Sequence, residues 1–467
     1  MPDPTPANLL WPKLDDARGP GYWLRPGNLL AGRRRLRTDH SNEWRYEFLR
    51  TSSQPAPPPG CDPDPEARSR SYTWLMGKPI PAGGFRCAIL GDTGEGDHSQ
   101  IGLLPILRHL KVDFLIINGD VAYPAGRNED YEQGFFQPYA GLGLPVWTVP
   151  GNHDYYSDNR GREYFEVFCT ELRRARWDAA RLVLRPQPGS YWELAEPAAK
   201  LVILGVDSGH SADLDGKRGG GLLGLFGERQ PPDTRQHEWL AWRLELAERA
   251  GASVILLFHI PALVDEKQVD KVYLGNLHQV IAQFSCVRLV LTAHTHNYQR
   301  YTPTVFAQYL SKVHGATPGG TAPTYLVSGA GGAYINATDF DNGSKTGFTA
   351  VSRYPTAADW KQWAPLGLRI VAGKLGHGVL NQAGIGVLKL FTKLAEQSDA
   401  DRPERLSLLL LTHVPPNQTT VQPYFIDDLA QMYGHLPAGT PIQVQEGDPD
   451  LDPASMGGCC RDETITF

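Results

Sequence analysis

The sequence lacks the features that mark several large classes of protein. It has six cysteines in 467 residues, with no CxxC pair and no zinc-module spacing, which argues against a disulfide scaffold or a zinc module. Acidic residues outnumber basic ones, and the formal net charge of −6 offers no basic face for nucleic acid. No apolar run reaches the roughly 18 residues of a membrane span. Nucleic-acid binding and membrane spanning are therefore not expected.

The start of the chain also lacks the basic segment and apolar run of a secretory signal. The scattered cysteines fit thiols that stay reduced. We therefore expect a cytoplasmic protein. The sequence leaves its oligomeric state open.

Shifts in composition predict five parts of the chain. Residues 1–84 form an N-terminal extension with a proline-rich linker, and residues 85–335 form the core. Residues 336–400 are a partly helical insertion, and residues 401–430 are a hairpin that returns to the core. Residues 431–467 are a C-terminal tail, which is acidic and expected to be loose from Gly447 on.

One stretch of the insertion, residues 360–395, ends in a short amphipathic helix with basic residues. We expect it to pack on its own domain. The alternative is peripheral contact with a membrane surface or with a partner.

Strands alternate with helices in the core. Apolar runs bounded by turn residues predict the strands, and apolar residues at helical spacing predict the helices. This alternation favours an α/β fold with mainly parallel pairing. The predicted strands are 85–90, 112–117, 145–149, 200–206, 252–258 and 287–292; the predicted helices are 101–110, 164–177, 233–250 and 269–285, and 341–354 is a predicted loop.

Polar residues follow five of these strands: Asp92, Asp120, Asn152, His259 and His294. In an α/β sheet the carboxyl ends of the strands form the edge where ligands bind. We therefore expect these side chains to belong to one site.

The residue types in this set are metal ligands. The apolar run 115–117 ends in Asn-Gly-Asp, so Asp120 projects from a strand end, and its two oxygens suffice to bridge two cations. Carboxylate, phenolate and amide oxygens are hard donors, and imidazole suits zinc, iron or nickel. With Asp120 shared, seven side chains make four contacts to each of two metals: Asp92, Asp120, Tyr123, Asn152, His259, His294 and His296. Two metals roughly 3.5–4 Å apart would clamp a phosphate and generate hydroxide at neutral pH.

The motifs Gly-Asp-x-Gly, Gly-Asp-x-x-Tyr, Gly-Asn-His-Asp, x-x-His and x-His-x-His, in this order, resemble those of the calcineurin-like metallophosphoesterase superfamily. The chain is most similar to the purple acid phosphatases. Most other branches carry a metal-binding histidine where this chain has Gly94, and Tyr123 is available here instead. The resemblance implies a four-layer α/β/β/α sandwich with mixed sheets, and a metal site at the C-terminal strand ends.

The same resemblance implies a cofactor of two metal ions, Fe(III) and a divalent ion that is Fe, Zn or Mn. It assigns Asp92, Tyr123 and His296 to Fe(III), assigns Asn152, His259 and His294 to the divalent ion, and makes Asp120 the bridge.

The hypothesis that follows is hydrolysis of a phosphorylated small molecule, a phosphomonoester, by a metal-bound hydroxide. Asp120 and Asn152 act through the metals. His153 protonates the leaving alkoxide or orients phosphate; the alternative is a hydrogen bond that only supports the ligands. His98, near the first ligand motif, is a further candidate for substrate binding.

Four other residues with polar side chains are not assigned to the ligand set. Asp154 is expected to hold its loop. Tyr298 and Arg300 either line the pocket or belong to the core. His413 has a context similar to that of His259, and we assign it to the closing hairpin.

Two alternatives stay open. The first is a phosphodiesterase or nucleotide pyrophosphatase on the same metal core, because the sequence does not choose among leaving groups. The second is a non-catalytic scaffold protein with a vestigial site. Loss of a ligand would favour the scaffold, but all seven ligands are present.

Overall fold

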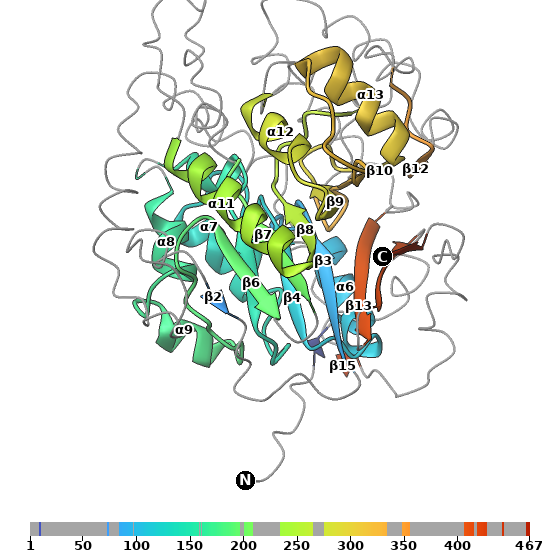
Figure 1. The fold of residues 1–467 in the computed structure, drawn as a ribbon. Helices are drawn as coiled ribbons and strands as arrows, with labels where there is room; N and C mark the ends of the chain where they lie inside the picture. The colour runs from blue at the N-terminus through green and yellow to red at the C-terminus, as the bar shows by residue number, and fades with distance from the viewer. Residues whose placement is uncertain are drawn as a thin grey trace, which may run out of the picture.

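A computed structural model gives the fold of the chain (Figure 1). The structure describes residues 84–208, except 97, 158, 160 and 197–199, and residues 234–264, 275–333, 348–354, 406–414, 418–426 and 464–467, with the short pairs 9–10, 72–73 and 441–442.

Two mixed sheets form the centre of the described fold (Figure 1). The six-stranded sheet has the order β16 (Ile465–Thr466), β14 (Gln418–Ile426), β13 (Leu406–Val414), β3 (Phe85–Leu90), β4 (Phe114–Asn118) and β5 (Val146–Val149). The eight-stranded sheet has the order β12 (Ser352–Tyr354), β10 (Tyr298–Tyr301), β11 (Thr324–Ser328), β9 (Val287–Thr292), β8 (Ser253–Leu257), β7 (Leu201–Gly205), β6 (Trp192–Glu196) and β2 (Tyr72–Thr73). Strands β3, β4 and β5 are parallel, as are β7, β8, β9 and β11. A separate pair consists of β1 (Leu9–Leu10) and β15 (Pro441–Ile442).

Side chains of the central strands alternate between two apolar layers. In β4, Phe114 and Ile116 belong to the layer between the sheets, whereas Leu115 and Ile117 belong to the layer on the outer face. Strand β8 follows the same rule, with Ile255 in the layer between the sheets. A parallel strand covered on both faces is apolar at every position, which is why these segments read as continuous apolar runs.

Helices cover the outer face of each sheet. On the six-stranded sheet the cluster of buried side chains includes residues of α6 (His98–His109), α8 (Arg162–Phe168) and α9 (Arg174–Ala179). On the eight-stranded sheet it includes residues of α11 (Thr234–Ala250), α12 (Gly275–Ala282) and α13 (Pro303–His314). Short turns complete the described helices: α7 (Asn128–Tyr131), η2 (Glu132–Phe136) and η3 (His153–Tyr155). The predicted four-layer α/β/β/α sandwich is confirmed.

Several predicted elements differ from the structure. The helix predicted over 164–177 is two helices, α8 and α9, and the chain folds back between them so that the Trp177 indole N–H donates to the Val167 carbonyl (3.0 Å). Residues 352–354, predicted as loop, pair with β10 as strand β12. The expectation of a loose tail is wrong for Ile465 and Thr466, which pair with β14.

Other segments were not recognised from their pattern. Strand β6, strand β10, helix α13 and strand β11 lie in stretches that the sequence left unassigned. The insertion stretch 360–395, with the short helix predicted at its end, lies outside the described residues, as does most of the N-terminal extension.

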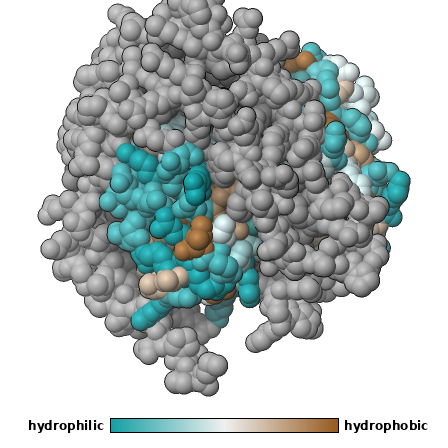
Figure 2. Space-filling view, turned by 90° about the vertical axis from the view of Figure 1, so that its left-hand side faces the viewer, coloured by the Kyte–Doolittle hydropathy of each residue, from teal (hydrophilic) through white to brown (hydrophobic). Residues whose placement is uncertain are grey.

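The hydropathy of the described residues bears on the question of a membrane span. In the described part of the chain, no helix is both long and apolar enough to cross a membrane. On the face shown in Figure 2, the described side chains are mainly hydrophilic, with small apolar areas among them.

Candidate metal centre

The predicted ligands come from both sheets and meet at one edge. Asp92 follows β3, Asp120 follows β4 and Asn152 follows β5, all in the six-stranded sheet. His259 follows β8 and His294 follows β9, both in the eight-stranded sheet. Because these strands are parallel within each sheet, their carboxyl ends converge there.

Two groups of ligand atoms share Asp120. One group consists of Asp92, Asp120 and His296, and within it the ligand atoms lie within 4.8 Å of one another. The Tyr123 hydroxyl lies among them, 3.0 Å from Asp92 Oδ1, 3.0 Å from Asp120 Oδ2 and 3.1 Å from His296 Nε2. Tyr123 is fully buried. We call this set the phenol cluster.

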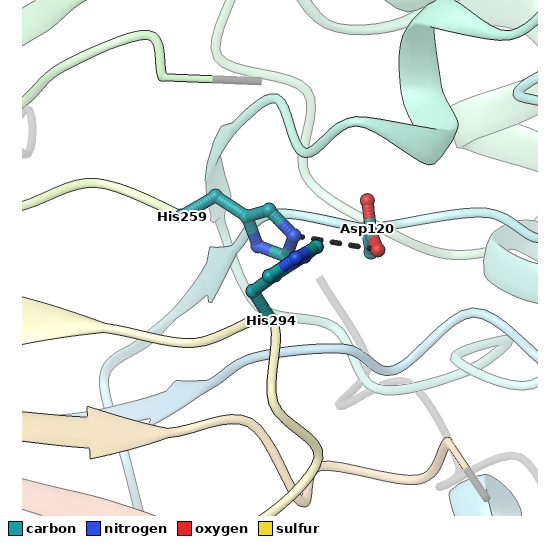
Figure 3. Close-up of side chains that lie close together, drawn as sticks. All are labelled: Asp120, His259 and His294. Carbon is teal, nitrogen blue, oxygen red and sulfur yellow. Dashed lines mark ion pairs between the residues drawn. The ribbon is translucent and has the colours of Figure 1, made fainter. Parts of the chain in front are cut away.

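The other group consists of Asp120, His259 and His294, again with ligand atoms within 4.8 Å of one another (Figure 3). His259 Nε2 is 3.3 Å from Asp120 Oδ2, and the two imidazole centroids are 5.2 Å apart. His259 Nδ1 lies 3.0 Å from the Asn118 carbonyl, which can only accept, so Nδ1 carries the proton. The arrangement leaves Nε2 as the ligand atom. We call this set the imidazole cluster.

The electrostatics of the two imidazoles differ. Burial lowers the pKa of His259, but the Asp120 and Asp92 carboxylates outweigh it and raise that pKa to about 9. Burial and the neighbouring His259 lower the pKa of His294 to about 3. Against the opposing effect of burial, the neighbouring histidines hold the pKa of Asp120 well below its usual range.

Asn152 supplies an independent test of whether the site fits metal ions. Its Nδ2 donates to the Tyr156 hydroxyl (2.8 Å), whereas its Oδ1 is buried and has no hydrogen-bond partner among the described residues. The next residue, His153, donates its backbone N–H to Asp120 Oδ1 (2.8 Å), so Asn152 lies beside the shared carboxylate. A buried acceptor without a donor is costly unless a cation meets it. The donor set fits two cations.

The backbone at four of these ligands has left-handed dihedral angles. The φ values are 57° at Asp92, 49° at Asp120, 74° at His294 and 51° at His296. Non-glycine residues adopt this region at a cost that the surrounding structure must offset, and such residues cluster at functional sites. One restraint is visible directly, because the His294 backbone N–H donates to Asp92 Oδ2 (2.6 Å). The side chain of Asp92, which follows a strand of the six-stranded sheet, thus restrains the left-handed backbone of His294, which follows a strand of the eight-stranded sheet.

The family of this domain follows from a comparison of its sequence. Residues 85–298 match the model of the family described as calcineurin-like phosphoesterase. This segment is a calcineurin-like phosphoesterase domain. The match confirms the predicted resemblance at the level of this family, which uses a dinuclear metal centre and whose members are hydrolases. No curated protein matches the chain.

Solved structures similar to this chain are distant. A purple acid phosphatase from yellow lupin is 13% identical with a TM-score of 0.44, and the match covers 75% of this chain and 52% of the lupin chain. This chain thus spans about half the length of the lupin enzyme. A dimetal phosphatase from Danio rerio is 15% identical with a TM-score of 0.35, covering 54% of this chain and 88% of its own. GAP50, the anchor in the inner membrane complex of Plasmodium, is 12% identical with a TM-score of 0.42. The match covers 77% of this chain and 87% of the GAP50 chain.

Asn118 and Gly119 position the imidazole ring of His259. Gly119 has φ +86°, and a Cβ there would overlap the His259 ring. The Asn118 amide reaches across to the other sheet, 3.4 Å from the Phe258 carbonyl and 3.3 Å from the Leu291 carbonyl. The sequence predicted the turn at Gly119, but not that the missing side chain makes room for a ligand.

The loop that carries Asn152 is tied to the loop that carries Asp120. The Asp154 carboxylate accepts from the backbone N–H groups of Val121 (3.2 Å) and Gly151 (2.8 Å) and from the Tyr131 hydroxyl (2.9 Å). Burial and the charge of Asp120 raise the pKa of Asp154 to about 7. These bonds agree with the expectation that Asp154 holds its loop.

His153 is half-buried beside the phenol cluster. Its Nδ1 lies 2.7 Å from the Pro124 carbonyl, and its ring centroid is 4.4 Å from that of Tyr123 and 4.8 Å from that of Tyr156. The imidazole is therefore oriented by one hydrogen bond and two aromatic rings.

The other candidates have different places in the fold. His98 is the first residue of α6 rather than part of a loop, and its side chain lies outside the described residues. Tyr298 packs in the layer between the sheets, 4.9 Å from the Phe425 ring, and is core rather than pocket wall. His413 lies in β13 and stacks on Phe85, at the end of β3 opposite Asp92.

Proposed function

We propose that the chain is a phosphatase of the purple acid phosphatase kind, which hydrolyses phosphomonoesters at a dinuclear metal centre. The phenol cluster would hold Fe(III) through Asp92, Tyr123 and His296. The imidazole cluster would hold a divalent ion, Fe, Zn or Mn, through Asn152, His259 and His294. Asp120 would bridge the two ions. The observation that carries the proposal is the pair of ligand groups that share Asp120, with the Tyr123 phenol inside one of them.

The donors of the two clusters support different cations. The phenol cluster contains two carboxylates, a phenol and one imidazole, and this set of hard oxygens favours the more highly charged ion. The imidazole cluster has two imidazoles and the shared carboxylate, and together with the Asn152 amide oxygen these donors suit a divalent ion. When bound, the ions supply Lewis acidity to a phosphoryl group and lower the pKa of water.

His153 is the residue of this chain that we assign to the leaving group. The Pro124 carbonyl can only accept a hydrogen bond, so Nδ1 of His153 carries the proton that the 2.7 Å contact requires. Proton transfer to a leaving alkoxide would then run through Nε2. The rings of Tyr123 and Tyr156 fix the plane of the imidazole, which positions that nitrogen before substrate binds.

The deciding experiment combines metal analysis, the visible spectrum and two substrates. Iron with a second metal, a broad visible band and hydrolysis of p-nitrophenyl phosphate in preference to its diester are the expected results. Faster hydrolysis of the diester would overturn the monoester assignment and support a phosphodiesterase. Two metals without colour would overturn the assignment of Tyr123 to Fe(III). A protein that binds no metal after reconstitution would contradict the proposal as a whole.

A further inference from the structure

The side-chain amide of Asn152 has two possible orientations that are nearly equal in shape. One presents Oδ1 to the centre and the other presents the NH2 group. A cation needs the oxygen, because the NH2 group is a donor with no lone pair to offer. A hydrogen bond accepted from the NH2 group would hold the amide with its oxygen toward the centre.

Tyr156 makes that contact. Its hydroxyl accepts a hydrogen bond from Asn152 Nδ2 at 2.8 Å, and Oδ1 on the other branch of the amide is buried without a hydrogen-bond partner among the described residues. The structure thus shows one branch satisfied by protein and the other left for a ligand.

The backbone keeps Tyr156 close to Asn152. Tyr156 ends the short 3-10 turn η3, its N–H donates to the His153 carbonyl (3.2 Å), and it lies four residues after Asn152. Its ring also lies 4.8 Å from that of His153. The hydroxyl is therefore held by the same turn that carries the proposed ligand.

We propose that Tyr156 is a positioning residue for the second metal: its hydroxyl fixes the Asn152 amide so that Oδ1 faces the cation of the imidazole cluster. This inference rests on the proposed dinuclear centre. No motif in the sequence assigns Tyr156 a role. Residues that orient metal ligands in this way typically account for about a 10–100-fold change in metal affinity.

The test is a double-mutant cycle on metal binding, with the metal-free protein titrated with Zn²⁺. In the protein that keeps the native Asn152 (the Asn152 background), Tyr156→Phe should weaken the affinity of one of the two Zn²⁺ binding events about 10–100-fold. It should leave the affinity of the other event unchanged. In the Asn152→Ala background, Tyr156→Phe should change neither event further, because the amide that the hydroxyl holds is absent.

The controls separate this role from packing and from failure of the centre. Tyr309→Phe removes a buried hydroxyl from α13, outside the centre, where it donates to the Ala262 carbonyl, and should leave both events unchanged. Equal losses in both Asn152 backgrounds would show that Tyr156 acts only by packing and would overturn the inference. Unchanged affinity in the Asn152 background would overturn it as well. A wild-type protein that binds no Zn²⁺ would instead overturn the proposed centre, with circular dichroism confirming that the protein is folded.

Discussion

The two sheets contribute different chemistry to the same site. The six-stranded sheet offers oxygen donors, namely Asp92, Asp120, Tyr123 and Asn152, whereas the eight-stranded sheet offers the imidazoles of His259, His294 and His296. Each cluster draws on both sheets. The centre is therefore complete only when the sheets are packed together, and bound cations would stabilise the packed state relative to the unfolded chain.

The layer between the sheets sets their spacing before any metal binds. Phe114 and Ile116 of one sheet and Ile255 and Leu257 of the other are buried in it. At the edge of this layer the Asn118 amide bonds the ends of β8 and β9. Burial of the apolar layer thus stabilises the packing of the two sheets, and the Asn118 amide fixes the position at which the two sets of ligands meet.

The largest expected effect comes from the one residue that both clusters need. Asp120→Ala should reduce phosphatase activity to background and release both metals, because the bridging carboxylate is lost. The measurement is metal content with hydrolysis of p-nitrophenyl phosphate. Asp113→Ala is the matched control. Asp113 directly precedes β4, at the end of the strand away from the centre, and its carboxylate accepts a hydrogen bond from the Arg86 N–H. A variant of Asp120 that keeps both metals would refute the bridging role.

The second-largest expected effect tests whether the His259 ring needs the space left by the missing side chain of Gly119. Gly119→Ala adds a methyl group that overlaps the His259 ring and also carries the cost of a left-handed residue, about 1–2 kcal/mol. Gly143→Ala carries a similar backbone cost at φ +71°, but nothing lies within 4 Å of its Cβ. We expect only Gly119→Ala to lose metal from the imidazole cluster. Equal metal content in the two variants would show that His259 does not depend on this space.

A smaller effect is confined to the phenol cluster. Tyr123→Phe should remove the visible band while the protein stays folded, with a change in unfolding free energy on the order of 1 kcal/mol for the lost hydroxyl. Visible absorption and thermal melting measure the two expectations. Tyr301→Phe, which removes a buried hydroxyl that donates to Gln299, is the control. An unchanged spectrum would rule out Tyr123 as an iron ligand.

The sequence was most informative where a strand ends in a polar residue. Apolar runs covered on both faces, such as 115–117, predict strands, and the parallel order brings Asp92, Asp120 and His259 to one edge. Individual side-chain contacts leave no comparable pattern in the sequence. The Asn118 amide bonds the Phe258 carbonyl 140 residues away, and the Tyr156 contact depends on the geometry of a short turn.

Elements with mixed environments were also missed, because their periodicity is weak. Strand β10 is four residues long and carries a polar face, with the Gln299 amide donating to Asn297 in the buried interior. Alternation over so few residues does not distinguish a short strand from a loop. The break in the predicted helix over 164–177 has a similar cause, since apolar residues at helical spacing continue across the turn between α8 and α9.

The smallest expected effect tests the claim that the six-stranded sheet gives oxygen donors to the centre. That sheet contains a buried histidine, His413, whose Nδ1 lies 2.9 Å from the Thr419 hydroxyl. Because His413 stacks on Phe85, at the end of β3 away from Asp92, His413→Gln should leave both metals in place. Loss of a metal from this variant would contradict the assignment of only oxygen donors to the six-stranded sheet.

The same variant should change the response of stability to acid. Burial lowers the pKa of His413, so the folded protein keeps this imidazole neutral at a pH where the unfolded chain, with a pKa of about 6.5, binds a proton. The unfolded state then holds more protons, and the free energy of unfolding falls as the pH drops below about 6.5. Glutamine does not titrate, so this part of the loss should vanish in His413→Gln. Denaturant unfolding of both proteins above and below about pH 6.5 measures it, and parallel pH profiles would show that His413 is protonated equally in both states.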